Sequence, residues 1–385
     1  MGWKVLVAPA SFKGSLSALE AGEAIRRGFA RAVPLAVVRV VPLADGGEGT
    51  VEALCRAVGG QMRTATVTGP LGSETVQARW AILSGGLAVI EMAQASGLPL
   101  VKPERRDPMA TTTAGTGELI REALAAGCRS VLVGLGGSAT VDGGLGAMRA
   151  LGAGFLDEQG RPVPPGGRGL LHLHRIDPTG LDPRLSGVSF TVLADVDNPL
   201  TGPDGAARVF GPQKGADPDA VVALDRGLAN LARVAARDLG SPNLATLPGG
   251  GAAGGLGLAL VAFLGARIVS GIDYVMEATG LAEQMAWADI VVTGEGQLDG
   301  QSRHGKACSG VARLAGAVGR PVVAIVGAVV GENEAVQVLG LDAVLPVPTG
   351  PVSLVQAMAG ATGYLEAAGA RLARLLLTGG RLAEP

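Results

Sequence analysis

The chain has 385 residues, of which 48% are apolar and 17% charged, and its formal net charge is −2. This length fits two domains with sizeable cores better than one. The near-neutral charge and the 3% of aromatic residues exclude a typical nucleic-acid partner, which needs basic stripes and stacking side chains.

No membrane or secretory signal is expected from the chain. It enters a predicted strand at Lys4–Ala8 without an apolar leader, and its three cysteines form no C-x-x-C pair. The longest uncharged stretch, residues 247–266, contains seven glycines and begins with a turn, so we expect no membrane span there. These features predict a cytoplasmic protein.

Short apolar runs alternate with helical patterns along the chain, which is typical of α/β folds with parallel sheets. Ser17 and Glu20 form a capping box before a predicted helix over Ala18–Ala32, and Asp217-Pro218 starts another over Asp219–Leu239. The nearly continuous apolar character of the strands predicts burial on both faces. These predicted strands are Lys4–Ala8, Val37–Pro42, Val131–Gly134, Thr191–Ala194, Asp289–Thr293 and Val322–Val326.

The pattern changes near residue 70, where two runs, Thr75–Leu83 and Leu87–Met92, flank Ser84-Gly85-Gly86 and predict an antiparallel hairpin. Regular alternation of strands and helices resumes near residue 285. We therefore predict that residues 1–70 and 285–385 form one α/β domain, and that residues 71–284 form an inserted mixed-sheet α/β domain.

Six loops combine glycine with acidic, hydroxyl or basic residues, mostly where a predicted strand ends. Glycine lets backbone N–H groups approach an anion closely, and carboxylates can hold a metal or accept a proton. The repeated pairing predicts phosphate chemistry. The loops are residues 8–15, 44–50, 134–144, 194–199, 248–255 and 293–299.

The loop at Gly134 allows three interpretations. Gly134-x-Gly136-x-x-Ala139 matches a dinucleotide fingerprint, but the Pro- and Gly-rich residues 160–169 interrupt the expected βαβ unit. An anion loop at a helix start, and a simple strand-to-helix turn, are the alternatives. The anion loop makes Gly136, Gly137 and Ser138 candidate phosphate ligands.

A second stretch, residues 300–307, is close to a P-loop but lacks the final Ser or Thr that ligates magnesium. We therefore expect no ordinary P-loop, although Lys306 stays a candidate phosphate ligand. Only five lysines occur in the chain, and two more, Lys13 and Lys214, lie in glycine-flanked loops. Both are candidate anion ligands.

Carboxylates follow the predicted strands, at the edge where open α/β sheets bind ligands. Each alone is best explained as a turn residue or helix cap, but together they supply what phosphoryl transfer needs: Mg²⁺ ligands and a proton acceptor. They are Asp45, Glu48, Asp195, Asp197, Glu295 and Asp299.

Seven motifs in order resemble the glycerate kinase family of the bacterial class I type, from about residue 4 to about residue 375. They are residues 8–17, 42–50, 136–144, 193–196, 210–215, 268–273 and 294–302. The resemblance implies ATP-dependent phosphorylation of D-glycerate with Mg²⁺. It also implies a Rossmann- or flavodoxin-like domain interrupted by a second α/β domain. The chain departs from the family at Ala10, where an aspartate is usual.

The resemblance and the loops together suggest a mechanism in the cleft between the domains. Asp195 or Asp45 would accept the hydroxyl proton, with Lys13 beside the transferring phosphoryl group. The remaining predicted roles are metal binding by Glu295, Glu48 and Asp299, phosphate binding by Gly136, Gly137, Ser138, Ser11 and Lys306, and substrate binding by Lys214, Asp197 and Asn198.

Two other functions stay open at this point. The first is an NAD-dependent dehydrogenase that uses the loop at Gly134, and the second is a catalytically silent sugar-acid or nucleotide sensor that lacks the acid at residue 10. The family favours 2-phosphoglycerate over 3-phosphoglycerate as the product, but the sequence does not choose between the hydroxyls. It also leaves a monomer and a homodimer open.

Overall fold

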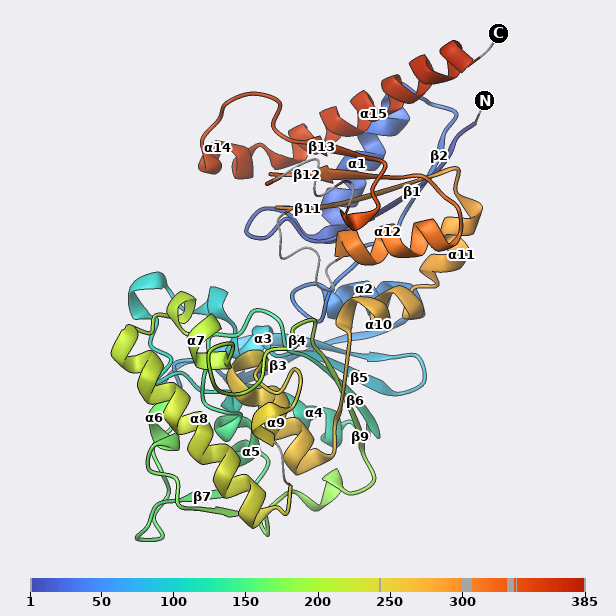
Figure 1. Ribbon diagram of the computed structural model, residues 1–385. Coiled ribbons are helices and arrows are strands. Elements are labelled where there is room, and N and C mark those ends of the chain that lie inside the picture. Colours follow the sequence, from blue (N-terminus) through green and yellow to red (C-terminus); the bar gives the residue numbers. More distant parts are fainter. Residues whose placement is uncertain (1, 242–243, 299–306, 331–335, 337, 384–385) are drawn as a thin grey trace. The chain divides into compact units, whose positions relative to one another are not determined.

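The computed structural model describes residues 2–241, 244–298, 307–330, 336 and 338–383 (Figure 1). The chain divides into two compact units. Unit 1 comprises Met1–Ala44, Glu52–Ala57 and Ile272–Pro385, and unit 2 comprises Asp45–Val51 and Val58–Gly271. The predicted boundaries near residues 70 and 285 differ from these divisions, because β3 (Gly60–Thr68) pairs with β4 (Thr75–Leu83) inside unit 2.

Unit 1 is built on a five-stranded sheet in which every neighbouring pair is parallel. Counted in chain order, the strands lie in the order 2-1-3-4-5, which is the flavodoxin-like, doubly wound arrangement. This confirms the predicted fold class for the domain formed by the chain ends. The strands, from β13 to β2 across the sheet, are Ala343–Pro346, Val322–Val326 (β12), Ile290–Glu295 (β11), Lys4–Pro9 (β1) and Val37–Val40.

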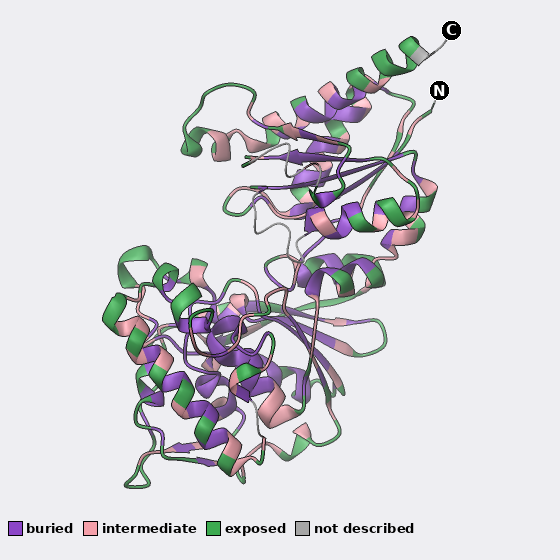
Figure 2. Ribbon diagram, in the orientation of Figure 1, coloured by how far each residue is buried: buried purple, intermediate pink, exposed green. Residues whose placement is uncertain are grey.

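Burial in this sheet follows strand position. β11 and β12 are buried at every residue, and β1 at every residue but Lys4, as the apolar runs predict (Figure 2). The same prediction is wrong for β2, whose residues are exposed or half-buried, because β2 forms an edge of the sheet.

The helices of unit 1 include α1 (Ala18–Ala32), which starts at the predicted Ser17–Glu20 capping box. It packs against α15 (Ala361–Ala383), beside which it lies in Figure 1. A Cβ at Gly28 would lie 1.8 Å from Glu366 O, so the two helices approach as closely as glycine permits. The other helices are α10 (Gly271–Ala278), α11 (Leu281–Trp287), α12 (Ala307–Ala317) and α14 (Leu354–Ala359), and α2 (Thr50–Val58) begins in unit 2 and continues in unit 1.

Unit 2 is built on a six-stranded mixed sheet, which confirms the second α/β domain. Four strands are parallel neighbours, and β5, β4 and β3 form an antiparallel meander that contains the predicted hairpin. In sheet order the strands are β10 (Arg267–Val269), β9 (Ser189–Leu193), β6 (Ser130–Gly134), β5 (Leu87–Glu91), β4 and β3. A separate pair, β7 (Gly154–Leu156) and β8 (Arg175–Asp177), is antiparallel.

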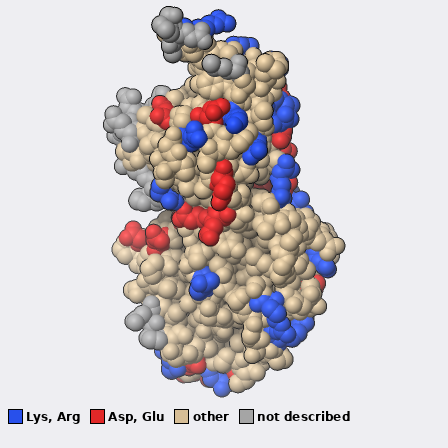
Figure 3. All heavy atoms as spheres, turned by 90° about the vertical axis from the view of Figure 1, so that its right-hand side faces the viewer, with Lys and Arg blue, Asp and Glu red and all other residues tan. Residues whose placement is uncertain are grey.

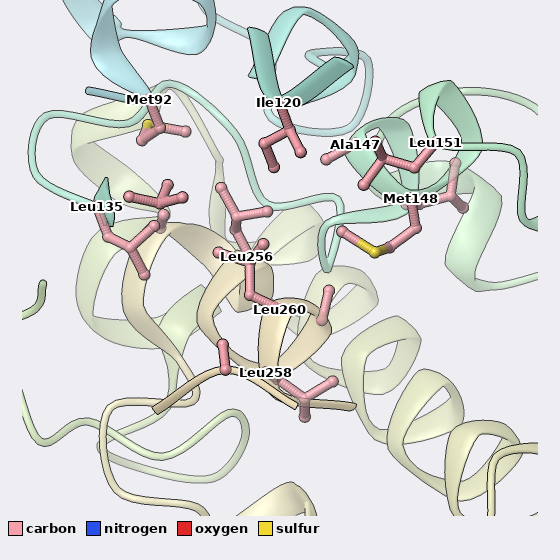
Figure 4. Close-up of a cluster of buried hydrophobic side chains, with 14 of the residues drawn as sticks. Met92, Ile120, Leu135, Ala147, Met148, Leu151, Leu256, Leu258 and Leu260 are labelled. Carbon is pink, nitrogen blue, oxygen red and sulfur yellow. The ribbon is translucent and has the colours of Figure 1, made fainter. Parts of the chain in front are cut away.

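The core of unit 2 lies under the loop that follows β6. Leu135 from this loop lies in one buried cluster with Ile120, Met148 and Leu256, which come from three helices (Figure 4). The α-helices are α3 (Ala93–Ser96), α4 (Ala114–Ala125), α5 (Leu145–Ala150), α6 (Gly167–Leu170), α7 (Ala206–Phe210), α8 (Pro218–Asp238) and α9 (Ala252–Leu264). Short 3₁₀ turns cover Leu98–Leu100, Pro103–Arg105, Pro183–Leu185, Pro212–Lys214 and Leu244–Thr246.

Candidate active site

Four parallel strands of unit 2 end at the same edge of its sheet. Glu91, the last residue of β5, is in register with Gly134 of β6, and Gly134 is in register with Leu193 of β9. Leu193 is in register with Val269 of β10. The residues that follow these strands therefore start from one edge, where open α/β sheets bind ligands.

The loop from Asp45 to Gly49 packs directly on this edge. Gly136 N–H donates to Gly46 O at 3.1 Å. A Cβ at Gly134 would lie 2.2 Å from Gly46 O, and a Cβ at Gly136 would lie 2.4 Å from Gly47 Cα. Gly134 and Gly136 thus allow two backbones to touch. The sequence predicts instead that the glycines of this loop let the backbone approach a ligand.

Asp45 and Asp195, the two predicted proton acceptors, are brought together at Gly271. Gly271 N–H and Ser270 Oγ donate to Asp195 Oδ1 at 2.8 and 2.9 Å. A Cβ at Gly271 would lie 2.3 Å from Asp45 O, so the Asp45 backbone touches the same residue. Gly47 N–H donates to Asp45 Oδ1 at 3.1 Å. Asp45 follows β2 of one sheet and Asp195 follows β9 of the other, and their roles as proton acceptors stay a prediction.

The loop after β6 offers backbone donors to an anion. Gly136 N–H is already bonded to Gly46 O, but among the described residues the N–H groups of Gly137 and Ser138 donate to no protein acceptor. Gly137 has φ of 76°, a conformation that glycine adopts without strain. Adjacent free N–H groups of this kind form anion-binding concavities.

Lys214 lies under this loop and is only 2% exposed. Its Nζ donates to Ser138 Oγ at 2.7 Å and to Thr140 O at 2.8 Å. Two of its three donors are therefore used by the loop itself. Direct pairing of Lys214 with the substrate stays a prediction, whereas its support of Ser138 is visible.

Asp142 is the buried anion near Lys214. It is fully buried and accepts hydrogen bonds from Thr113 N–H, Thr113 Oγ1, Gly144 N–H and Gly146 N–H at 2.8 to 3.1 Å. Burial lowers the pKa of Lys214 to about 7, although the charge of Asp142 opposes this change. Burial also raises the pKa of Asp142, against the effect of its hydrogen bonds.

Unit 1 collects its own predicted residues where the strand order reverses, between β1 and β11. Ser11 and Lys13 follow β1, and Glu295 is the last residue of β11 and 8% exposed. Ala10 N–H donates to Gly294 O at 2.8 Å, and a Cβ at Gly296 would lie 3.5 Å from Lys13 N. This is the switch point at which doubly wound sheets bind ligands.

The other predicted site residues are placed differently. Asn198 Nδ2 donates to Asp204 O at 2.8 Å, and Asp197 is exposed beside it. Glu48 is exposed in the loop before α2. Asp299 and Lys306 lie outside the described residues.

The residues present fit Mg²⁺ only as a partly hydrated ion. In the described part of the chain, no three His, Cys, Asp or Glu side chains lie close enough together to hold a metal unaided. Mg²⁺ is usually held by one or two carboxylates with substrate phosphates and water. Glu48 in the loop before α2 and Glu295 at the end of β11 are each a single carboxylate that could serve in this way within its own unit.

Sequence reasoning missed Glu91, which is 2% exposed at the end of β5. Its carboxylate accepts a hydrogen bond from Val51 N–H at 2.7 Å, in the first turn of α2. Burial raises the pKa of Glu91, and the charge of Glu48 adds to this effect. The sequence does show an acidic residue at the end of an apolar strand. Met92 and Ala93 follow it, however, so Glu91 does not belong to one of the glycine-containing loops by which the other candidates were found.

A surface hollow of about 760 Å³ belongs to a different part of unit 2. Its lining includes His172, His174, Arg226 and Asn230, and none of its lining residues comes from the loops at the sheet edge. This hollow and the loops at the sheet edge therefore do not coincide.

The space-filling view in Figure 3 shows how charged side chains are distributed over one face of the molecule. On the face in Figure 3, the Lys and Arg side chains of the described residues lie in separate groups among uncharged ones. Within the described residues, no helix is both long and apolar enough to span a bilayer.

Comparison with known proteins identifies the relatives of this chain. The model of the "Glycerate kinase family" matches residues 5–377. A glycerate kinase of Bacillus subtilis is 49% identical over 94% of this chain and 95% of its own length, and a glycerate 2-kinase of Escherichia coli is 47% identical over 98% and 99%.

A solved structure agrees with these matches. The crystal structure of a putative glycerate kinase 2 from Salmonella typhimurium has a TM-score of 0.83 and 46% identity, and the alignment covers 99% of this chain and 100% of that one. A match of this length includes both units and every loop described above, and the chain belongs to the glycerate kinase family of phosphotransferases.

Proposed function

We propose that the protein transfers the terminal phosphoryl group of ATP to D-glycerate, with Mg²⁺, and that the product is 2-phosphoglycerate. The whole-length match to glycerate kinases carries this proposal. The name of the Escherichia coli relative, glycerate 2-kinase, supports the choice of hydroxyl. The position of the Asp195 carboxylate after β9 supports the chemistry, because proton acceptance needs a carboxylate at a ligand-binding edge.

We assign residue roles separately to the loops at the sheet edge of unit 2 and to the loops after β1 and β11 of unit 1. In unit 2, Asp195 or Asp45 accepts the proton of the attacking hydroxyl, the N–H groups of Gly137 and Ser138 hold phosphate oxygens, and Lys214 supports Ser138 from below. Gly136 shapes this loop, and Asp197 and Asn198 contact glycerate at its rim. In unit 1, Ser11 and Lys13 bind phosphate.

Mg²⁺, when bound, neutralises charge on the transferring phosphoryl group. Its candidate ligands are Glu48 in unit 2, Glu295 in unit 1 and Asp299, each taken by itself, and Lys306 is a further candidate phosphate ligand. We also propose a cytoplasmic location and a small molecule, rather than a macromolecule, as the partner.

Phosphorus NMR of a reaction with Mg-ATP and D-glycerate tests the proposal. We expect ATP to be consumed and the signal of 2-phosphoglycerate to appear. The signal of 3-phosphoglycerate would contradict the choice of hydroxyl, and the absence of both products would contradict the kinase function.

The comparisons favour neither rival function. A dehydrogenase would bind NADH and turn over no ATP, and a silent sensor would bind glycerate without consuming ATP. The sensor depends on Ala10, which lies at the end of β1 beside Gly294. We therefore expect the wild type to be active, and we expect Ala10→Asp to change its rate but not to create an activity that was absent.

A further inference from the structure

Helix α2 begins without a cap of its own. Its N-cap residue is Gly49, with φ of 94°, and no side chain at that position accepts a hydrogen bond from the first turn. Glu91 fills this role from another element, because its Oε1 accepts the Val51 N–H at 2.7 Å across 40 residues of sequence. A carboxylate in this place also suits the positive end of the helix dipole.

A buried carboxylate is unfavourable unless it is well bonded, so its presence needs a reason. Glu91 is 2% exposed, and within the described residues no lysine or arginine forms an ion pair with it. It accepts a hydrogen bond from Val51 N–H and a longer one, 3.4 Å, from Gln94 Nε2, and the Gly49 N–H also favours its charged form. The group is therefore directed mainly at the start of α2.

A series of hydrogen bonds leads from that helix start to Asp45. Thr50, next to Val51, donates through Oγ1 to Gly47 O at 2.7 Å. Gly47 N–H donates to Asp45 Oδ1 at 3.1 Å. Fixing the first turn of α2 therefore fixes the loop that carries Asp45 and Glu48.

We propose that Glu91 is a positioning residue for phosphoryl transfer, which holds the start of α2 so that Asp45 and Glu48 keep their places at the sheet edge. This inference rests on the proposed function for the roles of Asp45 and Glu48. It goes beyond that function in assigning a task to a buried residue to which the proposed function gives no role.

The test compares Glu91→Ala and Glu91→Gln with Glu118→Ala in the full-length protein. Glu118 is a matched control, because it accepts Thr68 N–H at 2.7 Å in the same unit but at no predicted site residue. We expect Glu91→Ala to lower kcat at least tenfold with KM for glycerate changed less than threefold. Glu91→Gln should recover most of the rate, since its amide oxygen can still accept the Val51 N–H.

A second measurement, amide hydrogen exchange, needs no activity. Glu91→Ala should speed exchange at Val51 and in the loop before α2, while Glu118→Ala should leave these amides unchanged. Protected amides in Glu91→Ala would overturn the inference, and so would a wild-type kcat in that variant. A Glu91→Gln protein as slow as Glu91→Ala would also overturn it, because an acceptor would then not suffice.

The two proposals can fail separately. If the wild type phosphorylates no glycerate, the proposed function is wrong, and the exchange data alone then decide whether Glu91 holds the loop. If the wild type is active and both measurements leave Glu91→Ala like the wild type, the proposed function stands and the inference about Glu91 falls.

Discussion

Asp195 can be tested without disturbing the structure around it. Its Oδ1 accepts the Ser270 hydroxyl and the Gly271 N–H at the start of α10. An asparagine can make the same bonds through its carbonyl oxygen but cannot accept a proton. We expect Asp195→Asn to lower kcat by at least about 100-fold, the lower range of general-base catalysis.

Steady-state kinetics on D-glycerate measures this effect, and thermal unfolding should show little change. Asp238→Asn is the matched control, because Asp238 accepts the Ile176 N–H at 2.7 Å away from the site. A near-normal kcat in Asp195→Asn would leave Asp45 as the candidate base.

Lys214 makes stability depend on pH. Its folded-state pKa is about 7, below the ordinary value of 10.5, because it is buried. Between these values the unfolded chain holds the proton more tightly, so stability rises with pH across this window and is lost as pH falls toward 7. The free energy of unfolding should rise by at most about 1.4 kcal/mol per pH unit from this group.

Urea unfolding of the wild type and Lys214→Met between pH 7 and 9.5 isolates the contribution. The variant should lack this rise and at pH 9.5 should be less stable than the wild type by about 1–3 kcal/mol, since Ser138 and Thr140 lose a buried donor. Lys102→Met, at an exposed lysine, should follow the wild type. Parallel pH curves for all three proteins would contradict the assigned pKa.

The sequence could predict some of the site because strand ends of a parallel sheet share an edge. Asp195, which follows β9, was identified on that rule, whereas Asp45 follows β2 of the other sheet and was identified as the carboxylate of a glycine-rich loop. Lys214 was identified as an anion ligand, but its burial depends on packing under a distant loop, which no local pattern reports. Sequence reasoning missed the structural roles of Asp142 and Glu91, because these depend on hydrogen bonds between distant parts of the chain. Asp142 accepts from Thr113, 29 residues away, and Glu91 accepts from Val51, 40 residues away.

At the scale of elements, α1 and α15 provide a test of packing. Gly28 has no room for a Cβ, which would lie 1.8 Å from Glu366 O, whereas nothing lies within 4 Å of a Cβ at Gly379 on α15. Alanine normally stabilises a helix over glycine. We expect Gly28→Ala to destabilise the protein by about 1–3 kcal/mol through overpacking.

Gly379→Ala is the control and should stabilise slightly, by about 0.5–1 kcal/mol. Chemical unfolding measures both variants. Stabilisation by both changes would show that helix propensity, rather than the contact between α1 and α15, decides the effect at Gly28.

Local signals predicted the starts of two helices. The capping box at Ser17 and the Asp217-Pro218 pair both begin helices where expected, because their hydrogen bonds are formed within one turn. The strand from Val37 was expected to reach Pro42 and to be buried, but β2 ends at Val40 and is half exposed. Edge position depends on the order of strands in space, which hydrophobic patterns do not contain.

At the scale of the whole molecule, unit 2 is continuous from Val58 to Gly271 but also takes Asp45–Val51. We expect a fragment of residues 45–271 to unfold cooperatively. A fragment of residues 58–271 should be less stable by about 2–5 kcal/mol, because Gly136 N–H and Glu91 lose their partners and Gly134 loses its packing.

Urea unfolding followed by circular dichroism compares the two fragments. Equal midpoints would show that the Asp45 loop adds nothing to the stability of unit 2. The sequence placed this loop with the N-terminal domain, because a contiguous stretch is the simplest division of a chain. The contacts of Gly46 and Gly47 with Gly134 and Gly136 show that the Asp45 loop packs with unit 2 instead.

Of the three cysteines, Cys128 and Cys308 are buried and Cys55 is partly accessible. A maleimide dye should therefore attach first at Cys55, on α2, one turn beyond the Val51 amide that Glu91 holds. The natural thiol thus offers a fluorescent probe of that helix, which could follow nucleotide and glycerate addition in real time without engineering the chain.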